Sequence, residues 1–147
     1  FLGDGGAYFL GFSAAQLSIL LTSRNPNVSK WFPMLLCFYP IFETLFTMYR
    51  RLLIKKVSVG SPDASHLHQL IYRRIVKFLI PKEGSFTRNS ATSPFLWLLS
   101  IFTAIPAVFF WDNPFVLMGF CILFSVLYIS IYRLIVKLCH LALQVIC

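Results

Sequence analysis

The sequence predicts an all-α integral membrane protein with about four transmembrane helices and an amphipathic helix in a cytoplasmic loop. Hydrophobic residues make up 58% of the 147 residues and the mean hydropathy is +0.76, whereas soluble domains are roughly 45 to 50% apolar. Four windows of 17 to 19 residues contain no Lys or Arg. At about 1.5 Å per residue each is long enough to cross the hydrocarbon region. They are residues 6–22, 31–49, 95–111 and 115–132.

The first window follows a Gly-rich tetrapeptide that contains Asp4. The flanking glycines carry no side chains, so a metal ion or a phosphate could approach the backbone and the carboxylate together. Alternatively, Asp4 caps the helix that follows. Within the window Ala7, Gly11 and Ala15 form a stripe of small residues at spacing four, which favours close approach of another helix. That partner belongs either to this chain or to another part of the protein.

The start of the sequence, Phe1, has neither a methionine nor a charged leader before the first window. We therefore expect residues 1–147 to be the C-terminal part of one polytopic membrane domain, whose preceding helices are among its partners.

The second window carries an acidic residue, Glu43, and a proline, Pro40. An acid inside a span is costly and usually faces protein or water. A functional role and a structural one, such as hydrogen bonding to Thr44, Thr47 or a neighbouring helix, both remain open for Glu43. Pro40 removes a backbone hydrogen bond, so we expect the helix to bend there.

The loop at residues 50–93 holds nine of the thirteen Lys and Arg residues. By the positive-inside bias this loop and both ends of the chain face the cytoplasm, and the two short connections face outward. Asp4 then shares a face with the basic loop.

A helix is predicted within this loop from Pro62 to about Ile80, with Ser61 as its cap and Asp63 in its first turn. Its apolar residues recur at helical spacing with basic residues on the flanks. The pattern is typical of a helix at the lipid interface, and also of one packed on other loops. His66 and His68 lie near its start; in a regular helix they would point in different directions and could not hold one metal together.

The last two windows are joined by a tight turn at residues 112–114, and the four cysteines show no paired spacing. Neither a disulfide framework nor a zinc site is indicated.

Two segments resemble motifs of the polyprenyl-phosphate N-acetylhexosamine-1-phosphate transferases, the membrane family that includes the peptidoglycan translocase. The run FLGDGGA at residues 1–7 resembles F-[LM]-G-D-x-G-[SA]. Arg50 and Arg51, followed by SPDASHLHQL at residues 61–70, are similar to the family's R-R…S-P-[FxP]-D-x-x-H-[IL]-H-H-L. The two motifs lie in the family's order, one span apart. The resemblance covers residues 1 to about 75.

The resemblance implies transfer of a sugar 1-phosphate from a UDP-N-acetylhexosamine to undecaprenyl phosphate, at the cytoplasmic face of the bacterial inner membrane. The product would start cell-envelope polysaccharides, such as the O-antigen of lipopolysaccharide or cell wall polymers. The cofactor would be Mg²⁺, with Mn²⁺ as an alternative. Asp4 would be a metal ligand and, with His66 and His68, catalytic. The substrate-binding residues would be Ser61, Asp63, His66, His68, Gln69, Arg50 and Arg51. Membrane lipid is expected around the protein, a homodimer is left open, and no nucleic acid partner is expected.

Three departures from the family pattern bear on this expectation. Gln69 stands where many members have a second adjacent histidine, the segment between Ser61 and Asp63 is shortened, and the family's upstream aspartate-rich motif is absent from the chain. We therefore expect this chain alone to be inactive. The histidine pattern is closer to the hexosamine-phosphate branch, which favours a sugar such as GlcNAc over MurNAc-pentapeptide.

Two other functions compete with this interpretation. In a non-catalytic membrane subunit or lipid-binding module, Asp4 and the histidines would only cap helices and the basic loop would bind headgroups. A part of a transporter is less favoured, because Glu43 has no second acidic residue inside a span to pair with.

Overall fold

In the computed structural model the chain is described at residues 3–56, 66–76, 80 and 84–146. The described part consists of helices joined by turns. Three of them are long and apolar enough to cross a membrane, at Gly3–Arg24, Thr87–Phe109 and Pro114–Lys137. The expected all-α membrane architecture is therefore confirmed.

The second predicted span is interrupted. It is divided into α2 (Trp31–Leu36) and α3 (Phe38–Tyr49), which are separated at Cys37. The cause is Pro40, which has no N–H to donate to the carbonyl of Leu36, and whose ring collides with that carbonyl in a regular helix. The predicted bend is thus found as an interruption at Cys37, three residues before Pro40. The described residues contain three uninterrupted candidates for spans, and the fourth predicted span is this broken pair.

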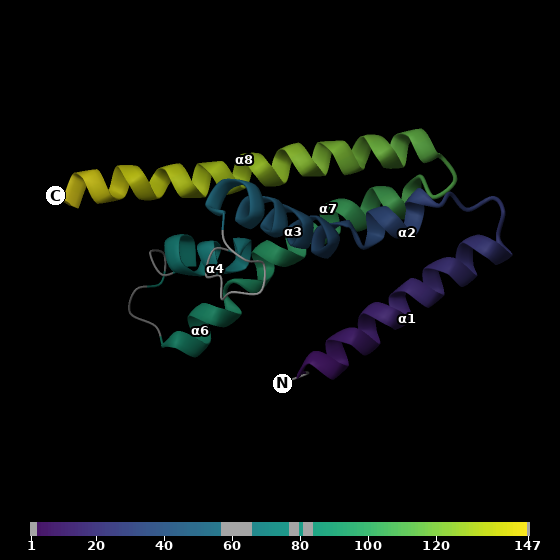
Figure 1. The fold of residues 1–147 in the computed structure, drawn as a ribbon, viewed down its shortest axis with the longest axis horizontal. Coiled ribbons are helices and arrows are strands. Elements are labelled where there is room, and N and C mark those ends of the chain that lie inside the picture. Colours follow the sequence, from purple (N-terminus) through teal and green to yellow (C-terminus); the bar gives the residue numbers. More distant parts are fainter. Residues whose placement is uncertain (1–2, 57–65, 77–79, 81–83, 147) are drawn as a thin grey trace.

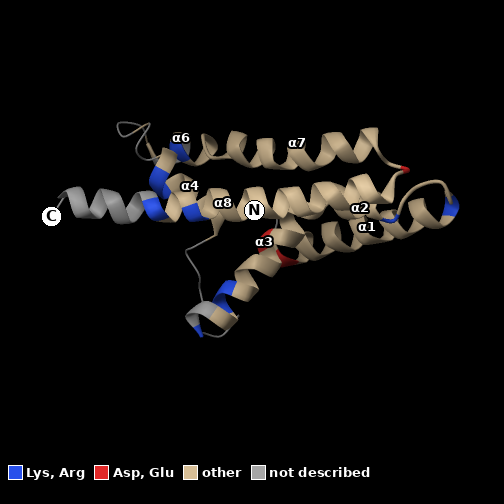
Figure 2. Ribbon diagram, turned by 90° about the horizontal axis from the view of Figure 1, so that it is seen from above, with Lys and Arg blue, Asp and Glu red and all other residues tan. Residues whose placement is uncertain are grey.

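The other boundaries also differ from the prediction. Helix α6 (Ser85–Ser90) and α7 (Ser93–Phe109) begin inside the segment assigned to the loop, and α8 (Pro114–Ile146) runs well past residue 132. Basic residues therefore lie on the extended end of α8 as well as in the loop. Figure 2 shows Lys and Arg gathered at the end of the molecule where α4, α6 and the second half of α8 lie.

Aromatic side chains fill the core between α3 and α8. Phe124 and Tyr128 of α8 are fully buried. Phe38 packs edge-on against Phe124 with ring centroids 5.5 Å apart, and Phe42 does the same against Tyr128 at 5.1 Å. Edge-to-face pairs of this kind add to the stabilisation from burial alone. The packing fixes the position of α3 and hence of the acidic residue on it.

At the end of the bundle away from α4 a backbone hydrogen bond joins the two short connections. The N–H of Ser29 donates to the carbonyl of Trp111 over 2.9 Å. This end lies opposite the loop that holds α4 (Figure 1).

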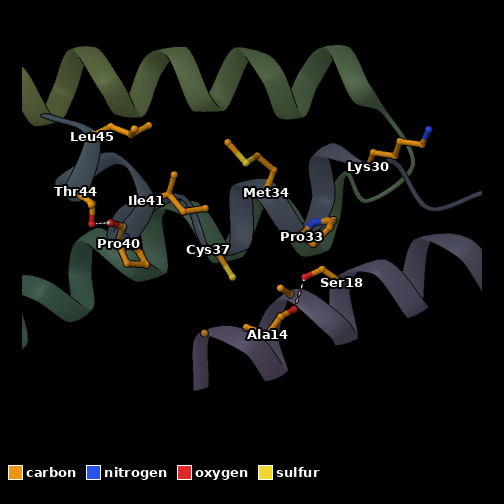
Figure 3. A pocket seen from close by; sticks show the side chains of 12 residues that line it. Ala14, Ser18, Lys30, Pro33, Met34, Cys37, Pro40, Ile41, Thr44 and Leu45 are labelled. Carbon is orange, nitrogen blue, oxygen red and sulfur yellow. Dashed lines mark hydrogen bonds between the residues drawn. The ribbon is translucent and has the colours of Figure 1, made fainter. Parts of the chain in front are cut away.

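Helix α1 (Gly3–Arg24) stands apart from the others (Figure 1), and it has no buried residue. A cavity of about 700 Å³ separates it from α2 and α3, with Gly11, Ala15 and Ser18 on one wall and Cys37 and Pro40 on the other (Figure 3). A Cβ built on Gly11 would meet nothing within 4 Å. Close packing on the small-residue stripe is therefore not made within the described part of this chain, and a partner helix from elsewhere remains a prediction.

The helix predicted in the loop is found, but with a later start. His66 has an extended backbone, and α4 (Leu67–Ile71) begins after it and continues as one π-helical turn, η2 (Tyr72–Val76). The predicted beginning at Ser61, Pro62 and Asp63 lies outside the described residues. Leu67, Leu70, Ile71 and Val76 are buried and α4 packs on α8. Of the two interpretations of its amphipathic pattern, the described part agrees with packing on protein.

Candidate functional site

The site is built where the start of α4 meets α3. The carboxylate oxygen Oε1 of Glu43 accepts a hydrogen bond of 3.0 Å from the backbone N–H of Leu67, the first residue of α4. That N–H has no acceptor within its own helix. Glu43 therefore caps α4 from a different helix, which explains why the helix begins at Leu67.

His66 is held by the same face of α3. Its ring nitrogen Nδ1 lies 3.5 Å from Oε1 of Glu43 and 3.4 Å from the hydroxyl oxygen of Thr47. Glu43 and Thr47 are four residues apart, so they lie on one side of the helix. The side chain of Glu43 is 12% exposed and that of His66 is 33% exposed. The carboxylate is thus shielded while the imidazole still reaches the surface.

The two histidines lie side by side. Their rings stack with centroids 5.7 Å apart and an interplanar angle of 16°. A regular helix would separate them, but the extended backbone of His66 brings its ring over that of His68. Desolvation by the surrounding protein lowers the pKa of His68 below its usual value; Glu43 opposes this shift and His66 adds to it. His68 is consequently neutral near pH 7.

The second oxygen of Glu43 is buried among aromatic residues. Oε2 has no hydrogen-bond partner among the described residues. The hydroxyl groups of Tyr39 and Tyr128 lie next to the carboxylate and interact with its charge. The carboxylate of Glu43 therefore lies between the aromatic core and the start of α4.

The predicted arginine pair lies at the end of α3. Arg50 and Arg51 begin the π-helical segment η1 (Arg50–Lys55), and each is only 5% exposed. The guanidinium of Arg50 donates to the hydroxyl of Tyr132 over 2.6 Å and lies 5.5 Å from the centroid of the Tyr132 ring. Arg50 thereby joins the end of α3 to α8.

Gln69, the residue that departs from the family pattern, is partly buried in α4. Its side-chain oxygen is buried and has no hydrogen-bond partner among the described residues. One turn further along the chain, Arg74 donates to the carbonyl of Ile135 over 2.8 Å. The helix that carries the histidines is therefore attached to α8 at one end and to α3 at the other.

Asp4 does not join this group. It lies exposed in the first turn of α1, whose start is well separated from α4 (Figure 1). Gly3, just before it, has φ +64, a conformation that favours glycine. Ser61 and Asp63 fall outside the described residues.

An exposed carboxylate is the kind of donor that Mg²⁺ takes, because the ion is bound through one or two carboxylates, waters and substrate phosphates. Over the described ranges there is no group of three His, Cys, Asp or Glu residues that could hold a metal. Asp4 therefore fits as one ligand, and the remaining ones would have to come from substrate, water or another part of the protein.

Sequence reasoning left the role of Glu43 open and did not identify Tyr132. A signal for Glu43 was present, since Glu43, Thr47 and Arg50 recur at spacings of four and three along one helix face. Tyr132 gave no such signal, because it meets Arg50 only through the packing of α8 on α3.

The chain is similar over part of its length to curated undecaprenyl-phosphate N-acetylglucosaminyl 1-phosphate transferases. A probable enzyme of this name from Bacillus subtilis is 39% identical over 69 residues, which is 46% of this chain and 19% of that protein. The enzyme from Yersinia pestis is 35% identical over 78 residues, covering 50% of the chain and 20% of the relative. The Thermotoga maritima enzyme is 31% identical over 78 residues, covering 53% and 25%.

The chain thus spans about a fifth to a quarter of the length of these relatives. No family model matches it, and no solved structure is significantly similar to it. The relatives carry the name of the family that the two motifs resemble, so the recognition made from the motifs is confirmed at the level of partial similarity.

Proposed function

We propose that this chain is part of an enzyme that transfers N-acetylhexosamine 1-phosphate, with GlcNAc as the first candidate, from a UDP-sugar to undecaprenyl phosphate. The observation that carries the proposal is the stacked pair His66 and His68, with His66 held against Glu43 and Thr47 of the helix that continues into Arg50 and Arg51. The partial similarity to enzymes named for this lipid and sugar supports it.

The roles follow from the charge of the substrates. A UDP-sugar and a polyprenyl phosphate are both anionic, and the basic end of the molecule would raise their local concentration. His66 and His68 would donate hydrogen bonds to the pyrophosphate and take part in proton transfer. Arg50, Arg51 and Gln69 would complete the binding site, together with Ser61 and Asp63 on the segment before α4.

Asp4 would hold a Mg²⁺ ion, or Mn²⁺ in its place. When bound, the ion neutralises charge that develops on the phosphates. This role requires the start of α1 to approach the histidine pair in the whole enzyme. A protein of the relatives' length would provide further helices between which α1 could be placed.

The enzyme would lie in the bacterial inner membrane with its active face on the cytoplasmic side. Its lipid-linked product would enter cell-envelope polysaccharide synthesis, such as that of O-antigen. A non-catalytic subunit is not favoured, because the relatives are named as transferases.

The test uses the full-length protein that contains this chain, and measures transfer of radiolabelled sugar phosphate from UDP-GlcNAc to undecaprenyl phosphate across a Mg²⁺ titration. Asp4→Asn keeps the shape of the side chain but removes its charge, so turnover should fall by on the order of 10² or more. His66→Ala and His68→Ala should weaken use of the UDP-sugar without affecting membrane insertion. Gln69→His should be tolerated.

A helix cap predicts a different result for the same variant. Asn caps a helix about as well as Asp, so transfer close to that of the wild type by Asp4→Asn would reduce Asp4 to a capping residue. Absence of transfer by the wild-type protein with every UDP-N-acetylhexosamine would reject the proposed activity.

A further inference from the structure

We propose that Glu43 is the positioning residue for His66: from inside the membrane helix it fixes the ring so that Nδ1 carries the proton and Nε2 is presented to the ligand. The proposal concerns the site of the proposed function and rests on it for its catalytic consequence. The geometry on which it stands is independent of any activity.

The first step is the location of the carboxylate. Glu43 lies within the second apolar window. An ionisable group there costs free energy unless it is paired with other protein groups or faces water. Oε1 serves two groups of the loop, the N–H of Leu67 at 3.0 Å and Nδ1 of His66 at 3.5 Å. The aromatic core around Tyr128 holds the helix that carries it. The carboxylate is therefore immobilised before any ligand arrives.

The second step concerns the His66 ring. Two oxygen atoms, from Glu43 and Thr47, face the same nitrogen, Nδ1. An ionised carboxylate can only accept hydrogen bonds and the hydroxyl oxygen of Thr47 can accept as well, so a proton on Nδ1 suits both contacts at once. In neutral imidazole the second nitrogen then has a free lone pair. The proton on one ring nitrogen is thus set by the partner of that nitrogen, as it is for histidines that bind metals.

The third step concerns the plane of the ring. His68 stacks on His66 at an interplanar angle of 16°. The backbone of His66 is anchored at the next residue by the bond from Leu67 to Glu43. Contacts at Nδ1, across the ring face and at the adjacent peptide leave little freedom for the imidazole. The side chain is 33% exposed, so part of the ring remains accessible to a ligand.

Nitrogen NMR tests this without any enzyme assay. The full 147-residue chain has three histidines, so ¹⁵N-imidazole labelling in lipid nanodiscs gives a small set of signals, and single His→Gln variants assign them. Wild-type His66 should be the tautomer with the proton on Nδ1. Glu43→Leu removes the contacts of Oε1 with Nδ1 of His66 and with the N–H of Leu67. The population of the tautomer with the proton on Nε2 should then at least double. Glu43→Gln keeps an acceptor without the charge and should give a smaller shift in the same direction.

Thr44→Val is the matched control. Thr44 is the next residue on α3, but its hydroxyl donates to the carbonyl of Pro40, so the His66 signals should not change. Unchanged His66 signals in both Glu43 variants would overturn the proposal, as would a wild-type ring with its proton on Nε2. If Glu43→Leu does not fold, Glu43→Gln decides by the same criterion.

The activity of the full-length protein then separates this proposal from the proposed function. Loss of a residue that orients a functional histidine typically costs about 10- to 100-fold, so Glu43→Gln should lower kcat/KM by about tenfold or more with expression unchanged. A tautomer shift in a protein that transfers no sugar would reject the function and leave the positioning role. Full activity despite a tautomer shift would show that the orientation of His66 is not used in the reaction, and would overturn the proposed consequence.

Discussion

At the scale of the residue, two neighbours shift the pKa of His68 in opposite directions. Desolvation lowers its pKa first, the carboxylate of Glu43 raises it, and the ring of His66 lowers it. Because the folded pKa lies below the unfolded one, the unfolded chain binds the proton more readily. The neutral ring therefore contributes stability that is fully present above the usual histidine pKa and is lost as the pH falls through the lowered value.

A titration of His68 by NMR should resolve these contributions. We expect a midpoint below that of an unperturbed histidine side chain, whose pKa is about 6.5. Glu43→Gln should lower the midpoint further, since it removes the group that raises it. Asp112→Asn is the matched control and should have no effect on the midpoint. Asp112 lies in the turn between α7 and α8, at the other end of the bundle from α4. A midpoint that rises in Glu43→Gln would contradict this electrostatic assignment.

The family motifs indicated His66, His68, Arg50 and Arg51. In the structure the histidines lie where α4 meets α3, and the arginines follow the end of α3. Two histidines in a basic loop are not a strong signal by themselves, so their selection depended on the order and spacing of the motifs. The partner of Glu43 could not be selected in the same way. It is a backbone N–H 24 residues away, which no side-chain pattern reveals.

At the scale of the element, Pro40 decides where α3 points. Figure 2 shows α3 turning away from the direction of α2. Helix α3 follows the interruption at Cys37, and Glu43 on this helix contacts the start of α4. Sequence analysis predicted a bend but not a separation into two helices, because a missing hydrogen bond can be met by a kink or by a break. Helix α2, on one side of the interruption, packs against α7 and α8.

Pro40→Ala should restore the bond to the carbonyl of Leu36 and join α2 to α3. Spin labels at Lys30→Cys and Met48→Cys, both exposed positions, would report this by pulsed EPR in a background where the native cysteines are replaced. The distance between the labels should lengthen in Pro40→Ala. Pro33→Ala is the control, since Pro33 lies in the first turn of α2, where no helical donor is required. Equal distances in all variants would show that Pro40 does not cause the break.

The amphipathic pattern of α4 illustrates a second limit of sequence reasoning. A buried stripe looks the same whether lipid or protein covers it. The contact between Arg74 and the carbonyl of Ile135 shows which surface covers the described part, and it depends on α8 extending beyond the predicted membrane window.

At the scale of the whole molecule, the composition was enough to predict the class. Apolar windows gave three helices that could span and the broken pair α2 and α3. The sequence could not place α1 against the rest, because its stripe of small residues makes no close contact with the other described residues. The relation of Asp4 to the histidine pair therefore remains a prediction.

The topology can be tested by labelling in sealed cells. Asn25 and Ser90 are exposed, and the distribution of basic residues predicts that they lie on opposite sides of the membrane. In a background without native cysteines, Asn25→Cys should react with an impermeant maleimide from outside, and Ser90→Cys only after permeabilisation. Reaction of both from the same side would refute the arrangement.

The chain by itself is expected to transfer no sugar phosphate. Asp4 is one exposed carboxylate without a second ligand among the described residues, so it should hold Mg²⁺ too weakly to organise two phosphates. Purified residues 1–147, supplied with UDP-GlcNAc and undecaprenyl phosphate, should release no UMP above background. Measurable release would mean that the catalytic residues have been misplaced.

The hydrogen bond between Ser29 and Trp111 joins the connection before α2 to the turn between α7 and α8. Ser29 lies two residues before α2, which packs on α7 and α8, and α3 follows after the interruption at Cys37. The contacts of Glu43 and Thr47 with Nδ1 of His66 are 3.5 and 3.4 Å long, so a shift of α3 by a few ångströms would break them. The two connections lie at the end of the bundle away from the histidines. By holding the start of α2 they help to keep α3 in contact with His66, so weakening them would weaken those contacts as well.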